Sequence, residues 1–194
     1  MRTLYLGLRP KPGTVHYPVI RTEKCGCIQP ALRLWHAFTH IIFTSQTTVE
    51  YWPGPWDKQV IAIGEATRNA LPTLPLPPIV APFATQEGVM QLVANLPGYF
   101  FLPHSKRARP NLTEFMKKKG IPYFALAIYD THFQCLQPIP PLEDFDEIVF
   151  TSPSTVEGFI RIFGMLPKDK KLRAIGPLTQ QALEVNREIL YNER

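Results

Sequence analysis

The sequence has few of the features that mark secreted, membrane or metal-binding proteins. It contains only three cysteines, Cys25, Cys27 and Cys135, and no secretory signal opens the chain, so we expect free thiols and a cytoplasmic location. No apolar run approaches the roughly 20 residues needed to cross a bilayer. The Cys-x-Cys segment lacks a second ligand pair, and only His36 and His40 are closely spaced histidines, so no metal site is expected.

Motifs for nucleotide binding and for acid–base catalysis are also missing. The chain has no G-x-G-x-x-G, no Walker lysine motif and no recognisable Ser-His-Asp or Cys-His order. Glu65 and Asp130, acids in candidate loops, form no evident catalytic pair. The net charge of +5 favours an anionic partner without saying whether it is nucleic acid, a membrane or a small polyacid. Nucleic acid has only this charge in its favour, because basic and aromatic residues are not interleaved.

What the sequence does contain is an internal repeat of two blocks. Ile42–Glu50 matches Val149–Glu157, with Phe, Thr, Ser, Thr, Val and Glu identical in register. Ala62–Leu71 matches Ala174–Leu183, sharing Ala, Ile, Gly, Thr, Ala and Leu. The spacing between the blocks differs by a few residues, which a loop can absorb. The repeat predicts two homologous units.

Each block reads as a short strand that passes into a helix. Strands are predicted at residues 40–43, 60–63 and 147–150, followed by Ser, Thr or Gly at the helix start. Such units predict parallel strands, whose carboxyl ends share the edge of the sheet where ligands bind. The free amides there can hold carboxylate or phosphate, although any one of these residues could merely cap its helix. The candidate binding residues are Thr44, Ser45, Gly64, Thr67, Ser152, Pro153, Ser154, Gly176 and Thr179.

The segment between the two copies adds a basic loop to this edge. It predicts a helix over residues 84–93, a strand over 99–102, a helix over 110–119 and a strand over 121–129. Ser105, Lys106 and Arg109 then lie in a strand-to-helix loop that is either solvated or in contact with an anion.

The ordered motifs resemble the uroporphyrinogen-III synthase family over about residues 15 to 185. They are I-F-T-S at Ile42, A-I-G at Ala62, Y-x-T at Tyr129, V-F-T-S-P-S at Val149 and A-I-G-P at Ala174. The resemblance implies an α/β fold of two similar parallel-sheet, flavodoxin-like lobes that grip the substrate in a cleft. A two-stranded ribbon, residues 18–21 and 128–131, would join a discontinuous terminal lobe, residues 1–22 plus 128–194, to an inserted lobe, residues 23–127.

The resemblance also implies a cofactor-free lyase of heme biosynthesis. The family removes water from hydroxymethylbilane, an eight-carboxylate tetrapyrrole, and closes the ring with the last pyrrole inverted, giving uroporphyrinogen III. Tyr129 matches the tyrosine thought to help the hydroxyl leave, with a half-buried ribbon tyrosine as the alternative. Thr67, Thr179, Ser152 and Ser154 match positions that hold substrate carboxylates, largely through backbone amides. The expected partners are this substrate and, transiently, hydroxymethylbilane synthase, and the chain is expected to be a monomer.

The terminal lobe departs from the family pattern. A few proline-rich residues between Leu8 and Val15 stand where the family places a helix between its first two strands. Only residues 186–194 follow the last matched helix, where the family usually adds a strand and a helix. We therefore expect a reduced terminal lobe, with a non-catalytic tetrapyrrole-binding or regulatory protein of the same fold as the alternative to an active synthase.

Overall fold

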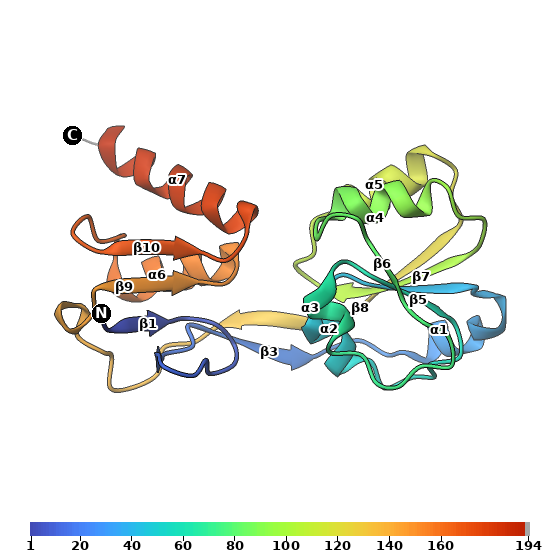
Figure 1. Ribbon diagram of the computed structural model, residues 1–194, viewed down its shortest axis with the longest axis horizontal. Coiled ribbons are helices and arrows are strands. Elements are labelled where there is room, and N and C mark those ends of the chain that lie inside the picture. Colours follow the sequence, from blue (N-terminus) through green and yellow to red (C-terminus); the bar gives the residue numbers. More distant parts are fainter. Residues whose placement is uncertain (193–194) are drawn as a thin grey trace. The chain divides into compact units, whose positions relative to one another are not determined.

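The computed structural model describes residues 1–192 and contains two β-sheets with helices packed against them (Figure 1). The strands are β1 Thr3–Tyr5, β2 Val15–His16, β3 Ile20–Lys24, β4 His40–Phe43, β5 Gln59–Ala62, β6 Ile79–Val80, β7 Phe100–Ser105, β8 Tyr123–Phe133, β9 Glu147–Phe150 and β10 Lys171–Ala174. The α-helices are α1 Gln29–Arg33, α2 Gln46–Tyr51, α3 Glu65–Arg68, α4 Gln86–Val93, α5 Asn111–Lys118, α6 Pro153–Phe163 and α7 Pro177–Asn192. Short 3₁₀ helices lie at Trp35–Ala37 and Leu142–Asp144.

Contacts within the chain divide it into two compact units. Unit 1 joins Met1–Thr22 to Thr131–Arg194, and unit 2 is Glu23–Asp130. The chain passes from one unit to the other within β3 and again within β8, which are neighbours in one sheet. Cys25 N donates to Ile128 O and Gln134 N donates to Val19 O, each at 3.0 Å, so these two segments pair in antiparallel fashion. Adding β3 makes the sheet of unit 2 mixed.

The sheet of unit 2 carries helices on both faces. Its strand order is β3-β8-β7-β4-β5-β6, and β8, β7, β4, β5 and β6 are parallel to one another. Successive side chains of a strand point to opposite faces, so Ile41 and Phe43 join one hydrophobic cluster and Ile42 joins the other. The first cluster includes Val49 of α2, whereas the second includes Val89 of α4, Leu112 of α5 and their neighbours.

The parallel strands of unit 2 change direction of winding between β4 and β7. Numbered along the chain, the order β6-β5-β4-β7-β8 is 3-2-1-4-5. Without the two-residue edge strand β6, the order β5-β4-β7-β8 is 2-1-3-4, which agrees with the first four strands of the flavodoxin-like order 2-1-3-4-5. Local sequence patterns identify strands and helices but not which strands become neighbours, so this order is known only from the structure. A reversal of winding leaves a crevice at the carboxyl ends of the two strands that flank it.

Unit 1 has a smaller sheet of parallel strands, in the order β10-β9-β1-β2. One hydrophobic cluster, which includes Leu4, Ile148, Phe159 and Leu183, joins the sheet to α6 and α7. Parallel neighbours usually need a crossover helix, yet residues 6–14 connect β1 to β2 without one, as the proline-rich sequence predicts.

Several predicted boundaries need correction. β7 continues to Ser105 rather than ending at Leu102, and α3 ends at Arg68, earlier than predicted. The last helix, α7, continues to Asn192, so most of residues 186–194 extend this helix. The strands predicted at residues 40–43 and 147–150 match β4 and β9 and are confirmed.

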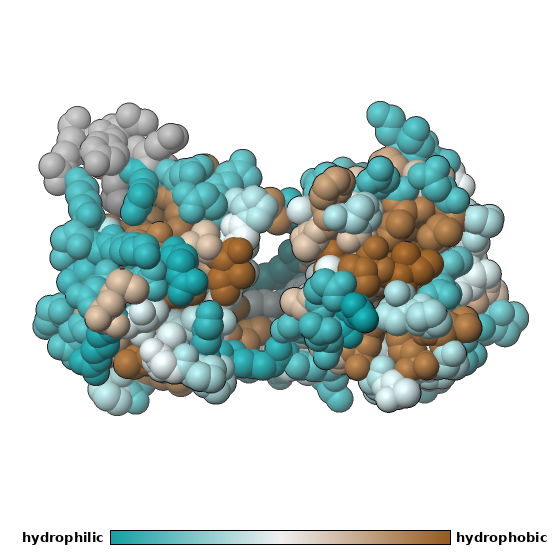
Figure 2. Space-filling model, viewed as in Figure 1, coloured by the Kyte–Doolittle hydropathy of each residue, from teal (hydrophilic) through white to brown (hydrophobic). Residues whose placement is uncertain are grey.

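Hydrophobic side chains are not confined to the two cores. Figure 2 shows hydrophobic atoms on the visible surface of each unit, among more numerous hydrophilic ones. Phe83 is 63% exposed in unit 2, and Ile175 is 56% exposed in unit 1. Phe83 follows β6 and Ile175 follows β10, so each unit has an exposed apolar side chain beyond the carboxyl end of a parallel strand.

Candidate functional site

A chain of three hydroxyl groups lies at the carboxyl end of β4 in unit 2. Ser45 caps α2, because its Oγ accepts a hydrogen bond of 3.0 Å from Thr48 N. The same oxygen lies 2.8 Å from Thr48 Oγ1 and 3.2 Å from Tyr129 Oη. Thr48 is 1% exposed. The cap therefore connects Tyr129 to the first turn of a helix.

The ring of Tyr129 is held on several sides. It stacks on Tyr51 at 5.4 Å with an angle of 12° between the rings. Its carbonyl accepts a hydrogen bond of 2.8 Å from Lys106 N, and its side chain belongs to the hydrophobic cluster on the α2 face. Tyr129 is 7% exposed, so it is more deeply buried than the half-buried ribbon tyrosine considered from the sequence.

Gly64 and Thr67 lie at the next strand end, after β5. Thr67 is buried, and its N–H donates to Gly64 O at 3.1 Å. The φ of Gly64 is 180°, which any residue adopts, so a tight turn does not explain the glycine. A Cβ at this position would lie 2.8 Å from Ala84 Cβ, so Gly64 allows a close approach of the segment before α4.

The basic residues after β7 do not all contact the same part of unit 2. Ser105 is the last residue of β7 rather than part of a loop, and its Oγ accepts from Arg107 N at 3.2 Å. Arg107 lies 3.8 Å from Asp130. Arg109 lines a pocket of about 300 Å³, and Thr44 lines the same pocket. The structure thus brings Thr44 and Arg109 together, whereas Ser105 and Lys106 are not among the lining residues.

Sequence reasoning missed most of this pocket. Its further walls include Gln86, Leu102, His104, Leu112, Tyr123 and Ala125, from four elements of unit 2. Gln86 Oε1 is buried and accepts no hydrogen bond from the described residues. The one signal in the sequence was the Thr85 cap, which places Gln86 at the start of α4.

The matching strand end of unit 1 uses the same residue types differently. Thr155 Oγ1 accepts from Thr151 N at 3.1 Å and Ser152 N at 3.2 Å, and donates to Ser152 O at 2.7 Å. Ser152 Oγ is buried and has no partner among the described residues. Thr155 Oγ1 therefore accepts from backbone N–H groups that precede α6, whereas Ser45 Oγ accepts from one inside α2.

The other candidates of unit 1 lie at the starts of two longer helices. Pro153 occupies the first turn of α6, where its missing N–H costs nothing, and Ser154 follows it. Gly176 precedes α7, and a Cβ there would meet no atom within 4 Å. Thr179 is buried and donates from its N–H to Gly176 O at 3.1 Å. Since β9 and β10 are parallel neighbours, these two helix starts share one edge of the sheet.

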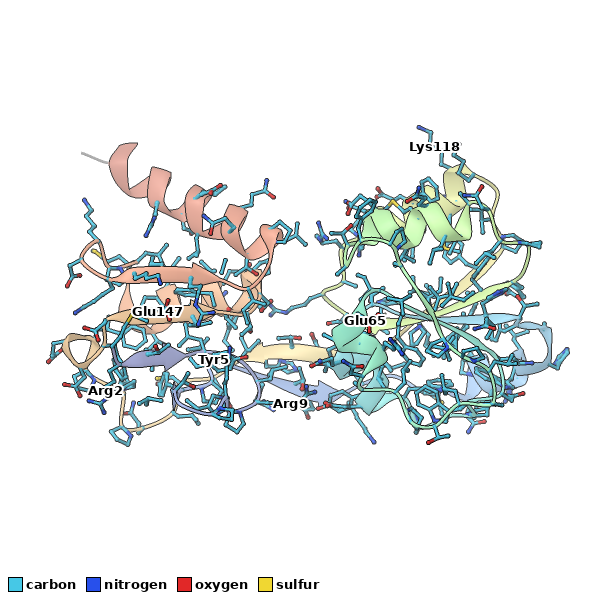
Figure 3. All side chains as sticks on the ribbon, viewed as in Figure 1. Arg2, Tyr5, Arg9, Glu65, Lys118 and Glu147 are labelled. Atoms are coloured by element: carbon cyan, nitrogen blue, oxygen red, sulfur yellow. The ribbon has the colours of Figure 1, made fainter. Side chains whose placement is uncertain are left out.

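A buried carboxylate supports the opposite, amino-terminal end of this sheet. Glu147 on β9 is 2% exposed and lies 3.0 Å from Lys171 Nζ and 3.2 Å from Arg173 Nε (Figure 3). Burial raises its pKa, but the hydrogen bonds and charges of Lys171 and Arg173 outweigh this and hold the pKa below its ordinary value. Because Glu147 begins the strand whose carboxyl end leads to Ser152, we assign it to structure.

Residues 1–192 contain no candidate for a membrane span or a metal site. No helix among them is long and apolar enough to span a bilayer. They contain no group of three or more histidine, cysteine, aspartate or glutamate side chains placed to hold a metal ion.

Comparison with known proteins relates this geometry to a family. The chain shares its fold with uroporphyrinogen-III synthetase from Helicobacter pylori 26695, at a TM-score of 0.67 and 18% identity over 100% of both chains. A mutant uroporphyrinogen III synthase from the extremely thermophilic bacterium Thermus thermophilus gives a TM-score of 0.63 at 20% identity, over 95% of this chain and 88% of that one. No curated protein matches the sequence. The family model described as uroporphyrinogen-III synthase HemD matches residues 13–187, and the chain therefore belongs to the uroporphyrinogen-III synthase family.

Proposed function

We propose that this protein converts hydroxymethylbilane into uroporphyrinogen III, with Tyr129 as the group that assists loss of the hydroxyl. Family membership supports the reaction, and the contact of 3.2 Å between Tyr129 Oη and Ser45 Oγ supports the role of the tyrosine. A buried tyrosine hydroxyl usually has a hydrogen-bond partner, and here that partner lies at a strand end where ligands bind.

Hydrogen-bond accounting gives Tyr129 a defined way to release its proton. Ser45 Oγ has two lone pairs and one hydrogen, and Thr48 N–H occupies one lone pair. If Thr48 Oγ1 donates to the second lone pair, Ser45 must donate to Tyr129 Oη. The phenolic proton of Tyr129 is then available for the leaving hydroxyl of the substrate.

In the proposed step, the carbon–oxygen bond of the hydroxymethyl group breaks and the Tyr129 proton joins the leaving oxygen to form water. The hydrogen bond from Ser45 stabilises the resulting phenolate. In the ring closure the hydroxymethyl carbon bonds to the α-carbon of the last pyrrole that already carries a methylene bridge, the bond from that α-carbon to its bridge breaks, and the bridge bonds to the free α-carbon. The free α-carbon loses its proton, which restores Tyr129. The sum is one substrate converted to one macrocycle and one water, with no oxidant or reductant.

The substrate carboxylates need cationic or N–H groups, and each unit supplies some of them. In unit 1 the starts of α6 and α7 offer backbone amides at Ser154 and beside Gly176, and these helices of 11 and 16 residues have substantial dipoles. In unit 2 the helices α2 and α3 have only six and four residues, so Arg109 supplies the charge that short helices lack. We propose that the two units act as the two lobes implied by the family resemblance.

The test is an isomer assay with hydroxymethylbilane generated in the reaction mixture by the preceding enzyme. We expect uroporphyrinogen III to exceed the spontaneously formed isomer I, with separation of the two by chromatography. Isomer I alone, from folded protein, would show that the chain is not a synthase. Tight binding of uroporphyrinogen without turnover would indicate a tetrapyrrole-binding protein instead.

A further inference from the structure

The pocket of unit 2 lies at the point where the winding of the sheet reverses. Thr44 follows β4, while His104 belongs to β7 and Arg109 follows it, and all three line the pocket. β4 and β7 are the strands between which the order reverses. In open α/β sheets this position, at the carboxyl ends of the strands, is where ligands bind.

The polar groups of the pocket are complementary to an anion that also carries an N–H donor. Arg109 supplies a fixed positive charge, and the described residues place no carboxylate within 4 Å of it. His104 Nδ1 lies 2.7 Å from Ser105 O, so it must be the donor and Nε2 is the nitrogen left for a ligand. Gln86 Oε1 is a buried acceptor with no donor, which is costly unless a ligand supplies one.

The remaining walls are mostly apolar, with Thr113 as the one further residue with an aliphatic hydroxyl. Leu102, Leu112 and Ala125 come from β7, α5 and β8, and Tyr123 adds an aromatic side chain. A pocket of about 300 Å³ is at the lower end of the range for small-molecule sites. It therefore suits one five-membered ring with its side chains, and not four rings together.

We propose that this pocket holds one pyrrole ring of the tetrapyrrole substrate, with a carboxylate arm on Arg109 and the pyrrole N–H on Gln86 Oε1. The proposal rests on the proposed function, since that function supplies a substrate made of such rings with two carboxylates on average for each. The pocket is on the face covered by α4 and α5, whereas Tyr129 packs in the cluster on the α2 face. The ring in the pocket is consequently an anchor for the substrate and not the ring that loses water.

Glu87, whose carboxylate interacts electrostatically with Arg109, does not neutralise the anchor. Glu87 is exposed, and the hydrogen bonds from its own N–H and from Thr85 lower its pKa, with the charge of Arg109 as a smaller contribution. Glu87 is not a lining residue and forms no ion pair with Arg109 among those found in the described structure. Arg109 thus keeps its capacity for a ligand carboxylate.

The experiment follows binding of porphobilinogen, a monopyrrole with two carboxylate arms, to the full-length ¹⁵N-labelled protein by NMR. We expect the Gln86 side-chain amide and the Thr44 backbone amide to shift on titration. Arg109→Gln should weaken binding about tenfold, because it removes a charge-assisted hydrogen bond. Lys118→Gln removes the same charge from the exposed end of α5, away from the lining residues, and should change binding less than twofold (Figure 3).

A matched pair of ligands tests the N–H contact. Pyrrole-2-carboxylate should bind more tightly than furan-2-carboxylate, which has no N–H, and Gln86→Leu should abolish the difference. Ala125→Leu should block both ligands by filling the pocket, and its thermal unfolding curve shows whether it is folded. If Ala125→Leu does not fold, Arg109→Gln still tests the pocket. Arg109 is exposed, so replacing it should leave the fold intact.

The outcomes separate this proposal from the proposed function. Conversion of hydroxymethylbilane to isomer III, with no shift at Gln86 or Thr44 or with equal binding by Arg109→Gln, would overturn the pocket and leave the synthase intact. Binding that depends on Arg109 and Gln86, in a protein that forms only isomer I, would support the pocket and reject the synthase.

Discussion

Ser45 in unit 2 and Ser152 in unit 1 occupy the same place in the repeat but differ in their surroundings. Each follows Phe and Thr at a strand end and precedes a threonine three residues later. Ser45 Oγ contacts Thr48 N, Thr48 Oγ1 and Tyr129 Oη, whereas Ser152 Oγ has no partner among the described residues. One repeat therefore supports two arrangements, one built around a serine and the other around a threonine.

The difference teaches that neighbouring strands decide what a repeated motif can do. In unit 2, β8 brings Tyr129 within hydrogen-bond distance of the cap. In unit 1 the corresponding threonine, Thr155, turns its hydroxyl back to the chain before its helix. We infer that chemistry is concentrated in unit 2 and that unit 1 mainly holds the substrate.

The largest effect is expected from Tyr129→Phe, which removes only the hydroxyl. We expect the rate of isomer III formation to fall by about 100-fold or more, since a positioned proton donor typically contributes that much. The thermal stability should change little because the stacking on Tyr51 remains. The measurement is the isomer assay together with a thermal unfolding curve.

A matched control removes a hydroxyl from unit 1, in which we assign no proton donor. Thr179→Val should affect substrate affinity more than the rate at saturation. Equal rates for Tyr129→Phe and the unchanged protein would mean that the buried hydroxyl contributes only to the structure. The proton donor could then no longer be assigned to unit 2.

The second prediction compares loss of the hydroxyl at the two threonines that the repeat places at matching positions, Thr48 and Thr155. Thr155→Val should cost about 2 kcal/mol of the free energy of unfolding, because two backbone N–H groups lose their acceptor. Thr48→Val removes one contact between hydroxyls and should cost about 1 kcal/mol. Urea unfolding of both variants measures the difference, and a larger loss for Thr48→Val would contradict the assigned partners.

The sequence was sufficient to predict the strand–cap–helix units, because local patterns determine them. The strands before Ser45 and Ser152 and the helices after them were predicted close to their observed positions. The missing helix between β1 and β2 was also predictable, since the connecting segment is short and rich in proline.

The pocket could not be predicted, because it depends on contacts between distant segments. Gln86 and Ala125 are far from Thr44 in the sequence and meet it only when β7 pairs with β4. The reversal of strand order that creates the crevice is a property of topology, which neither periodicity nor capping reports. For the same reason, Arg109 could be identified as a candidate, while its neighbours in the pocket could not.

The third prediction is that unit 1 loses stability before unit 2 when the pH is lowered. The folded-state pKa of Glu147 is depressed below its ordinary value of 4.5, so its contribution is present above about pH 4.5 and is lost as the pH falls through the folded-state value. Lys171 and Arg173 are partly exposed, which limits the contribution to about 1 kcal/mol. The described part of unit 2 contains no buried carboxylate, so amide hydrogen exchange should accelerate in unit 1 before unit 2 on acidification.

Glu147→Gln provides the control for this pH effect. The variant should be less stable at pH 7 and should lose the earlier acceleration of exchange in unit 1. If the strands of unit 1 exchange equally early in the variant, another group is responsible for the acid sensitivity.

The smallest effect should come from Ser152→Ala, and its contrast with Ser45→Ala is the most direct test of the difference between the two units. Ser45→Ala removes a helix cap and should cost about 1 kcal/mol of stability, while Ser152→Ala removes a buried hydroxyl without a partner and should cost close to none. Ser45→Ala should also lower the rate at saturation, about tenfold if its hydrogen bond stabilises the Tyr129 phenolate. Ser45→Thr, which restores a hydroxyl, should recover much of that rate. Equal unfolding free energies and equal rates for the two alanine variants would mean that the two copies of the motif do the same work, contrary to their different hydrogen bonds.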